Sequence, residues 1–146
     1  MIQNQLFMHL ATTPPSLRLR LPRPPSANNL YSNIKKVGRV KSKKYNEWIR
    51  LATPCYPDQT DPLFTQYVAV ILKAGVPDKR KRDIANIEKP INDYLVNKNI
   101  LKDDSQIRAL FLHWDDLNEA HNDVIVQVFD LVQLYDALVK IMNDPT

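Results

Sequence analysis

The segment TQYVAVILKA, residues 65–74, combines apolar and β-branched residues, and this pattern predicts a central strand of a β-sheet. Three other segments also have strand patterns. Leucine alternates with arginine in LRLRL (17–21), which indicates a half-buried strand, whereas QIRALFLHW (106–114) and DVIVQVFD (123–130) are largely apolar. We expect the last two segments to pair as an antiparallel hairpin around the polar connection DDLNEAHN.

Three helices are predicted between and after these strands. The first covers residues 42–52 and begins with a serine N-cap. The second lies within residues 83–99, where Pro90 requires a helix start close before it or a kink, and where Asn99 suits a left-handed stop. The third covers residues 131–144. The order β-α-β-α-β-β-α predicts one α/β (α+β) domain, in which helices pack on a mixed sheet of about four strands.

The composition is that of an ordinary globular protein, with 146 residues, 44% hydrophobic and 25% charged. No apolar run approaches the length of a membrane span, and MIQNQLFMHLATT lacks the cationic start of a secretory signal. The single cysteine, Cys55, excludes an internal disulfide and fits a reducing compartment. We therefore expect a cytoplasmic protein with a flexible arm over residues 1–16 and one domain over residues 17–146.

Charge is distributed unevenly along the chain, whose net charge is +4. Residues 35–44 include six cations and no acid, and residues 79–82 are four cations in a row. By contrast, residues 115–130 carry four Asp, one Glu and no Lys or Arg. This asymmetry favours a cationic face that binds a polyanion over a uniformly solvated surface. The candidate DNA-contacting cations are Lys79, Arg80, Lys81, Arg82, Arg39, Lys41, Lys43 and Lys44.

The sequence DKRKRDIANIEK, residues 78–89, places one aspartate at the end of a cationic run. Cleavage of a phosphodiester uses a hard cation such as Mg²⁺, which prefers carboxylate oxygens. A lysine near the scissile phosphate can stabilise the transition state or protonate the leaving oxygen. The residues of the required types are Asp83, Lys89 and the adjacent pair Asp103 and Asp104, although these two acids could equally cap a turn.

Three motifs in these regions resemble the RusA family of Holliday junction resolvases. They are PPSANNLYSN…GR (24–39), PDKRKRDIANIEKPINDYL (77–95) and LKDDSQI (101–107). The family has, in the same order, a PPS-NN motif, a P-D-(basic)-R-D-x-D-N-x-x-K motif and a D-D-x-Q segment. The resemblance extends from residue 17 to about residue 130 and leaves the first 16 residues uncovered.

The resemblance implies a small homodimer that uses Mg²⁺, or Mn²⁺ in its place, to nick symmetrically related strands of four-way DNA junctions. Such proteins are common in phages and prophages, and the resemblance implies neither a small-molecule cofactor nor a membrane. It also favours a DNA-facing role for Asn28 and Asn29, which otherwise shape a turn after the prolines. The site residues that it implies are Asp83, Ala85 (where the family has Asp), Asp104, the neighbouring acid Asp103, and the essential lysine Lys89.

The chain departs from the family pattern at Ala85, because the motif D-x-D becomes Asp83-Ile84-Ala85. A methyl group cannot bind a cation, so we expect cleavage to be impaired. Two explanations remain open: a substitution that blocks cleavage while leaving DNA binding intact, or a natural relative that only binds DNA. A junction- or duplex-binding protein that never cleaves is therefore the alternative function, and an interaction domain for an acidic protein is a third class.

The predicted helix also raises a geometric problem. A helix over residues 86–98 spans about 20 Å, with Asp83 at one end and Asp104 just beyond the other. One metal ion cannot join carboxylates that far apart. Either the chain folds back sharply after Asn99, or Asp104 of the partner subunit completes the site. A homodimer would also match the two-fold symmetry of a four-way junction.

Overall fold

The computed structural model describes residues 5, 8–10, 12–76, 78–79 and 82–143. Four strands form the main sheet in the order β1-β6-β4-β5, namely β1 (Leu17–Pro22), β4 (Val68–Gly75), β5 (Ile107–Asp115) and β6 (Asp123–Asp130). Strand β4 is parallel to β5 and antiparallel to β6, and β6 is antiparallel to β1. The prediction of an α+β fold with a mixed four-stranded sheet is confirmed.

The predicted hairpin between residues 106–114 and 123–130 is wrong. Both segments are strands, but β4 lies between them, so the connection after β5 crosses over the end of β4. Gly75 makes this crossing possible, because a Cβ atom there would lie 1.5 Å from the backbone oxygen of His121. The physical reason is burial: almost every residue of β4 is buried, so this strand needs a neighbour on each side, whereas β5 is half-buried and suits an edge.

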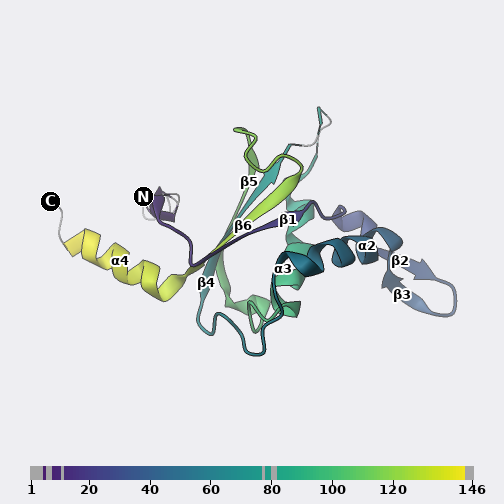
Figure 1. Ribbon diagram of the computed structural model, residues 1–146, viewed down its shortest axis with the longest axis horizontal. Helices are drawn as coiled ribbons and strands as arrows, with labels where there is room; N and C mark the ends of the chain where they lie inside the picture. Colours follow the sequence, from purple (N-terminus) through teal and green to yellow (C-terminus); the bar gives the residue numbers. More distant parts are fainter. Residues whose placement is uncertain (1–4, 6–7, 11, 77, 80–81, 144–146) are drawn as a thin grey trace.

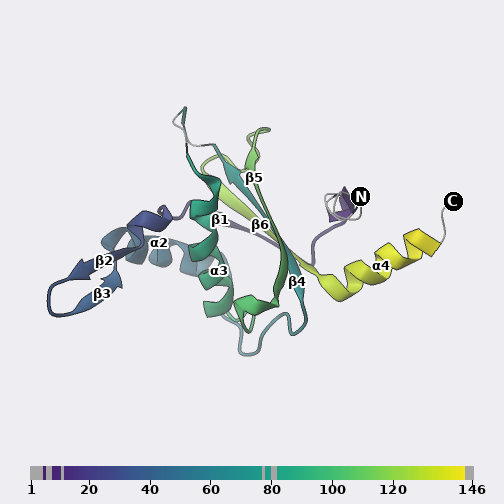
Figure 2. The ribbon, with the colours of Figure 1, turned by 180° about the vertical axis from the view of Figure 1, so that it is seen from behind.

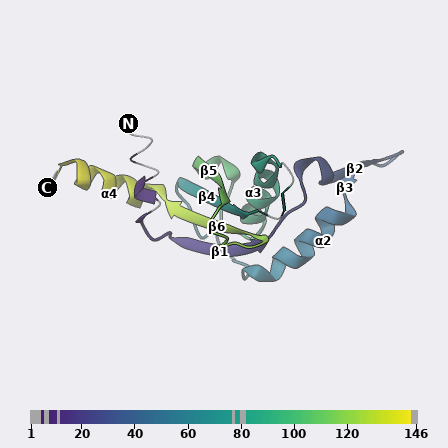
Figure 3. The same cartoon turned by 90° about the horizontal axis from the view of Figure 1, so that it is seen from above.

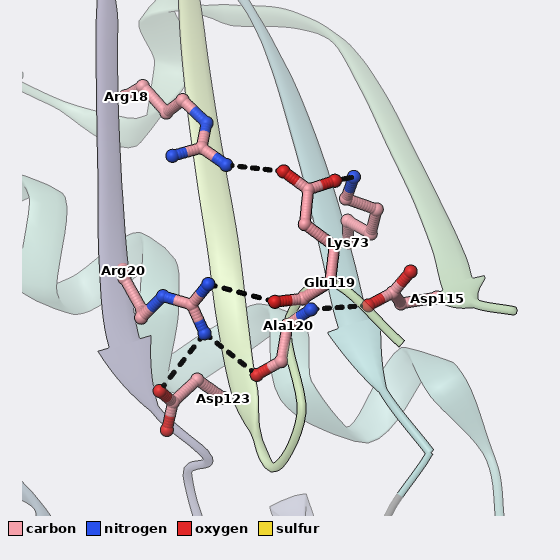
Figure 4. A network of polar contacts seen from close by, with 7 residues as sticks. All are labelled: Arg18, Arg20, Lys73, Asp115, Glu119, Ala120 and Asp123. Atoms are coloured by element: carbon pink, nitrogen blue, oxygen red, sulfur yellow. Dashed lines mark hydrogen bonds and ion pairs between the residues drawn. The ribbon is translucent and has the colours of Figure 1, made fainter. Parts of the chain in front are cut away.

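Polar contacts hold the crossing connection against both outer strands (Figure 4). The Glu119 carboxylate accepts hydrogen bonds from Lys73 on β4 and, at 2.8 Å, from Arg18 on β1. Arg20 donates to the backbone oxygens of Glu119 and Ala120, each at 2.9 Å. The buried Asp115 carboxylate accepts the backbone N–H of Ala120. These contacts fix the β5–β6 connection across the carboxyl end of the central strand β4.

Helices α2 (Lys43–Ala52) and α3 (Glu88–Asn97) pack on one face of the sheet and share its main core cluster. The Ser42 hydroxyl caps α2 by accepting the Tyr45 N–H at 3.1 Å, as the sequence predicted. The second helix begins with the 3₁₀ turn η3 (Ile84–Ile87), so Pro90 lies within the first turn of α3 and causes no kink. Asn99 adopts a left-handed conformation (φ 54°) and ends this unit.

The opposite face of the sheet carries a smaller apolar cluster around Ile71 and Phe129. Leu10, from the segment predicted as an arm, is buried in it, as are two residues of the first turns of α4 (Leu131–Asn143). The rest of α4 projects away from the sheet (Figures 1 and 2). Among the described residues, no helix combines the length and the apolar character that a bilayer span requires.

A β-ribbon that the sequence analysis did not predict projects at the opposite end from α4 (Figures 1 and 3). Its strands are β2 (Tyr31–Ile34) and β3 (Gly38–Lys41), which form a separate antiparallel sheet. Lys36 (φ 69°) and Gly38 (φ 97°) provide the left-handed conformations that its short turn requires. At the base, the Ser42 N–H donates to the Leu30 carbonyl at 2.9 Å, which joins the ribbon to α2.

Candidate functional site

Asp83 lies where the chain enters η3, on the loop that follows the carboxyl end of β4. One of its carboxylate oxygens accepts the Ala85 N–H at 3.0 Å, so the side chain caps the 3₁₀ turn. Both Asp83 and Ala85 are exposed. A carboxylate at position 85 would therefore remain in contact with solvent, two residues from Asp83, without disturbing the core. The local geometry therefore leaves room for carboxylates at both position 83 and position 85, as in the D-x-D motif.

Lys89 lies in the first turn of α3, one helical turn beyond Ala85. Its ammonium group pairs with Asp93 at 3.3 Å, and the Tyr45 hydroxyl donates to the same carboxylate at 3.4 Å. Burial of Tyr45, together with the negative charge of Asp93, raises the pKa of this phenol well above its usual value. Asp93 thus holds the lysine along the first turns of α3, through a contact that also ties α3 to α2.

Asp103 and Asp104 lie at the start of the 3₁₀ turn η4 (Asp104–Gln106), which leads into β5. Asp103 is its N-cap, and the Ser105 hydroxyl, which donates to the Asp103 carboxylate at 2.5 Å, holds the pKa of that acid below its usual range. Gln106 anchors the turn by donating to the Phe64 carbonyl at 2.9 Å. Asp104 is exposed, in a turn whose backbone is firmly held.

The chain does not bring Asp83 and Asp104 together. Strands β4 and β5 run parallel in register; Asp83 follows the carboxyl end of one and Asp104 precedes the amino end of the other. The eight residues of β4 separate these two ends of the sheet by about 23 Å. Within the described residues, no group of three or more His, Cys, Asp or Glu side chains could hold a metal ion.

The proline-rich segment does reach Asp83. The turn η1 (Ala27–Asn29) contacts η3, and Asp83 lines a cavity of about 220 Å³ together with Pro24, Ser26 and Trp114. Asn29 donates to the Ser26 hydroxyl at 3.0 Å, and Asn28 and Asn29 are both exposed. Two of the three sequence motifs therefore meet at one place, although they are more than 50 residues apart along the chain.

The predicted DNA-contacting cations form two exposed groups. Arg39 stacks on Tyr31 (4.1 Å to the ring centroid) and Lys41 lies over Tyr45 (5.6 Å), so aromatic rings position the cations of the β-ribbon. Lys43 and Lys44 begin α2 and are exposed. In the second group, Lys79 and Arg82 are exposed and Arg82 pairs with Asp78 at 2.9 Å, whereas Arg80 and Lys81 lie outside the described residues.

Three residues that the sequence analysis did not select also belong to this region. Arg23 and Trp114 line the cavity beside Asp83, and Asp93 positions Lys89. Asp93 could have been found from its i, i+4 spacing with Lys89 on a predicted helix. No sequence signal could have found Arg23 and Trp114, because β1 and β5 are brought to the same cavity only by tertiary structure.

An acid at a helix entrance, a lysine one turn later and clustered cations around them are typical of proteins that act on a phosphate-containing polymer. The family model of endodeoxyribonuclease RusA matches residues 22–129, so the chain belongs to this family, and the resemblance of its motifs is confirmed. The family comprises endodeoxyribonucleases that act on Holliday junctions. A search of curated proteins found no match to the chain.

Proposed function

We propose that this protein is a Mg²⁺-dependent endonuclease that resolves four-way DNA junctions by symmetric nicking, and that Ala85 impairs cleavage in the present sequence. The observation that carries this proposal is the exposed arrangement of Asp83 and Ala85 at the turn η3 and of Lys89 in the first turn of α3, beside a cavity and a cationic surface. Family membership supports the DNA substrate. The cation requirement, the impairment and the two-fold assembly are proposals that rest on the chemistry of these residues.

The side chains of this site suit a hard divalent cation only if position 85 also supplies a carboxylate. Asp83 offers a carboxylate oxygen beyond the one that accepts the Ala85 N–H, and carboxylate oxygens are the ligands Mg²⁺ prefers. When bound, the ion would neutralise charge developing on the phosphate and activate water. Lys89 can hold the same phosphate or protonate the leaving oxygen, because its ion pair with Asp93 is exposed and easily exchanged. Ala85 supplies no ligand.

We further propose that Asp104 of the partner subunit completes each site. The two acids of one chain lie at opposite ends of the sheet, and Mg²⁺ binds its ligands at about 2.1 Å, so one chain cannot use both. In an isologous dimer, the amino end of β5 in one subunit would lie beside η3 of the other, and both sites would form at once. Two equivalent sites suit the two equivalent strands of a junction. Dimerisation would then be a requirement for catalysis.

The cationic ribbon supports the same substrate. Arg39, Lys41, Lys43 and Lys44 extend from the region of η1 outward, and Asn28 and Asn29 join this surface to the Asp83 cavity. Contacts of this kind hold a phosphate backbone without reading its sequence. A steep decrease of binding with salt would distinguish a nucleic acid from an acidic protein partner, since DNA releases condensed counterions when it is bound.

The test is a nicking assay on a synthetic four-way junction that compares the chain as it stands with Ala85→Asp. We expect the Ala85→Asp variant to nick the junction only when Mg²⁺ is present, and the unmodified chain to bind the junction with little or no cleavage. Ala85→Asn is the matched control, because it fills the same volume without a charge. If Ala85→Asp binds the junction but cleaves no branched substrate, the favoured function becomes the alternative, a DNA-binding protein that does not cleave.

A further inference from the structure

Arg23 has an unusual environment for an arginine. It follows β1 and precedes two prolines, and its guanidinium lies over the ring of Trp114, 5.8 Å from the centroid. Its Nε and Nη2 atoms are buried, and no group within the described part of the chain accepts a hydrogen bond from them. Two buried N–H groups without acceptors are costly for the folded state even on a partly exposed arginine, so this arrangement indicates a role other than stability.

The surroundings of Arg23 favour an anion. Its guanidinium lines the cavity of about 220 Å³ that also contains Asp83, Asn86 and Arg82. Burial and the nearby charge of Arg82 lower the pKa of Arg23, whereas the carboxylates of Asp78 and Asp123 act in the opposite direction with smaller effect. The nearby carboxylates therefore only partly balance the positive charge of Arg23. An anion placed between the guanidinium groups of Arg23 and Arg82 would supply the missing hydrogen-bond acceptor.

The shape of the site narrows the choice of anion. Arg23 lies over one face of Trp114, so a nucleobase cannot stack on that face while the contact persists. A planar guanidinium donates two parallel hydrogen bonds, which match a pair of phosphate oxygens. We propose that Arg23, together with Arg82, binds a backbone phosphate of DNA in this cavity, immediately beside Asp83. This inference rests on the proposed function, and it adds a phosphate-binding residue that lies outside the cationic run and the acidic motif.

The test uses the present chain, which retains Ala85 and is suited to binding measurements. We compare Arg23→Met, which keeps the apolar stem, with Arg50→Met as the control. Arg50 is exposed and already paired with Glu47 through contacts of 3.0 and 2.6 Å, and its replacement changes the net charge by the same amount. The measurement is the dissociation constant for a four-way junction over a series of salt concentrations.

We expect Arg23→Met to weaken junction binding by roughly tenfold to a hundredfold, the range for a lost hydrogen bond to a charged group. We also expect the slope of log K against log salt to become shallower by about 0.9, which corresponds to one phosphate contact. Arg23→Lys should recover part of the affinity, because it restores the charge without the planar pair of donors. Arg50→Met should leave both quantities unchanged within about twofold.

Thermal unfolding separates this role from a structural one. Removing two buried and unsatisfied N–H donors should raise the Tm of Arg23→Met by about 3 °C, whereas loss of a structural arginine would lower it. Weakened binding with a raised or unchanged Tm supports the inference. Weakened binding with a lowered Tm, or an unchanged affinity and salt slope, overturns it while the proposed function stands. If the unmodified chain binds neither junction nor duplex DNA, the proposed function and this inference fail together.

Discussion

Mixing two inactive subunits should restore cleavage if each site takes Asp83 from one protomer and Asp104 from the other. The perturbation is made in the Ala85→Asp background, with Asp83→Asn in one subunit and Asp104→Asn in the other. Each variant alone forms dimers in which both sites lack one acid. In the mixed dimer the two substitutions meet in a single site, and the other site regains its full set of carboxylates.

The expected activity follows from the geometry. The two acids of one chain lie beyond opposite ends of the parallel pair β4 and β5, which is about 23 Å long, so a site within one chain would require a different fold. Random pairing makes about half of the dimers mixed, each with one intact site of two, so the mixture should cleave at about a quarter of the parental rate. It should also nick only one strand of each junction, because the second site in the mixed dimer lacks two of its three acids.

The assay follows nicks on the two strands of a labelled four-way junction, with the variants co-expressed under different affinity tags so that mixed dimers can be isolated. The control is a chain that carries both substitutions, paired with the parental chain. If the sites are shared, each site of that dimer lacks one acid, whereas in the mixed dimer both substitutions fall in a single site. Isolated mixed dimers that bind the junction yet remain as inactive as either single variant would refute the shared site. The three acids would then have to meet within one chain, contrary to the fold described here.

Two further predictions concern the crossing connection. Gly75→Ala should destabilise the protein by about 3 kcal/mol in urea unfolding, because its Cβ would overlap the His121 oxygen. Gly38→Ala has free space around its Cβ and should cost only about 1 kcal/mol. Equal effects of the two substitutions would contradict a tight crossing at Gly75. Lys73 lowers the pKa of the Glu119 carboxyl, so the stability this pair contributes is present above the unfolded pKa of about 4.3 and is lost over the interval in which pH falls from that value through the lowered folded pKa. Glu119→Gln should therefore show a smaller loss of stability over that interval, and parallel pH profiles would exclude this contribution.

The sequence predicted those elements whose signals are local. The cap at Ser42, the placement of Pro90 in a first turn and the stop at Asn99 each depend on backbone chemistry within a few residues, and all three are found in the structure. The hairpin prediction failed because strand pairing depends on which strand is buried on both faces, and β4 competes successfully for the position beside β6. Neighbouring strands in sequence are often, but not always, neighbours in space.

The same distinction between local and tertiary signals applies to the residues of the candidate site. Asp83 and Lys89 could be selected from one short segment, since helical spacing places them near one turn. Arg23 could not, because its significance arises only where the end of β1 meets Trp114 from β5. Spacing along the sequence also could not place Asp104 relative to Asp83, because their relation depends on the direction of β5 relative to β4. Residue types are local properties, whereas their convergence depends on topology.

The position of Lys89 shows how the ribbon and the site are physically connected. Arg39 lies over Tyr31, the Tyr31 ring meets Tyr45 edge-on at 5.9 Å, and the Tyr45 hydroxyl reaches the carboxylate of Asp93, which pairs with Lys89. The final contact is an exposed ion pair at 3.3 Å, worth about 0–1 kcal/mol, so a phosphate can displace Asp93 from the lysine at little cost. After that exchange the hydrogen bond from Tyr45 would still hold the Asp93 carboxylate in its position on α3. We therefore propose that Asp93 holds Lys89 in place before DNA binds and releases it to a phosphate.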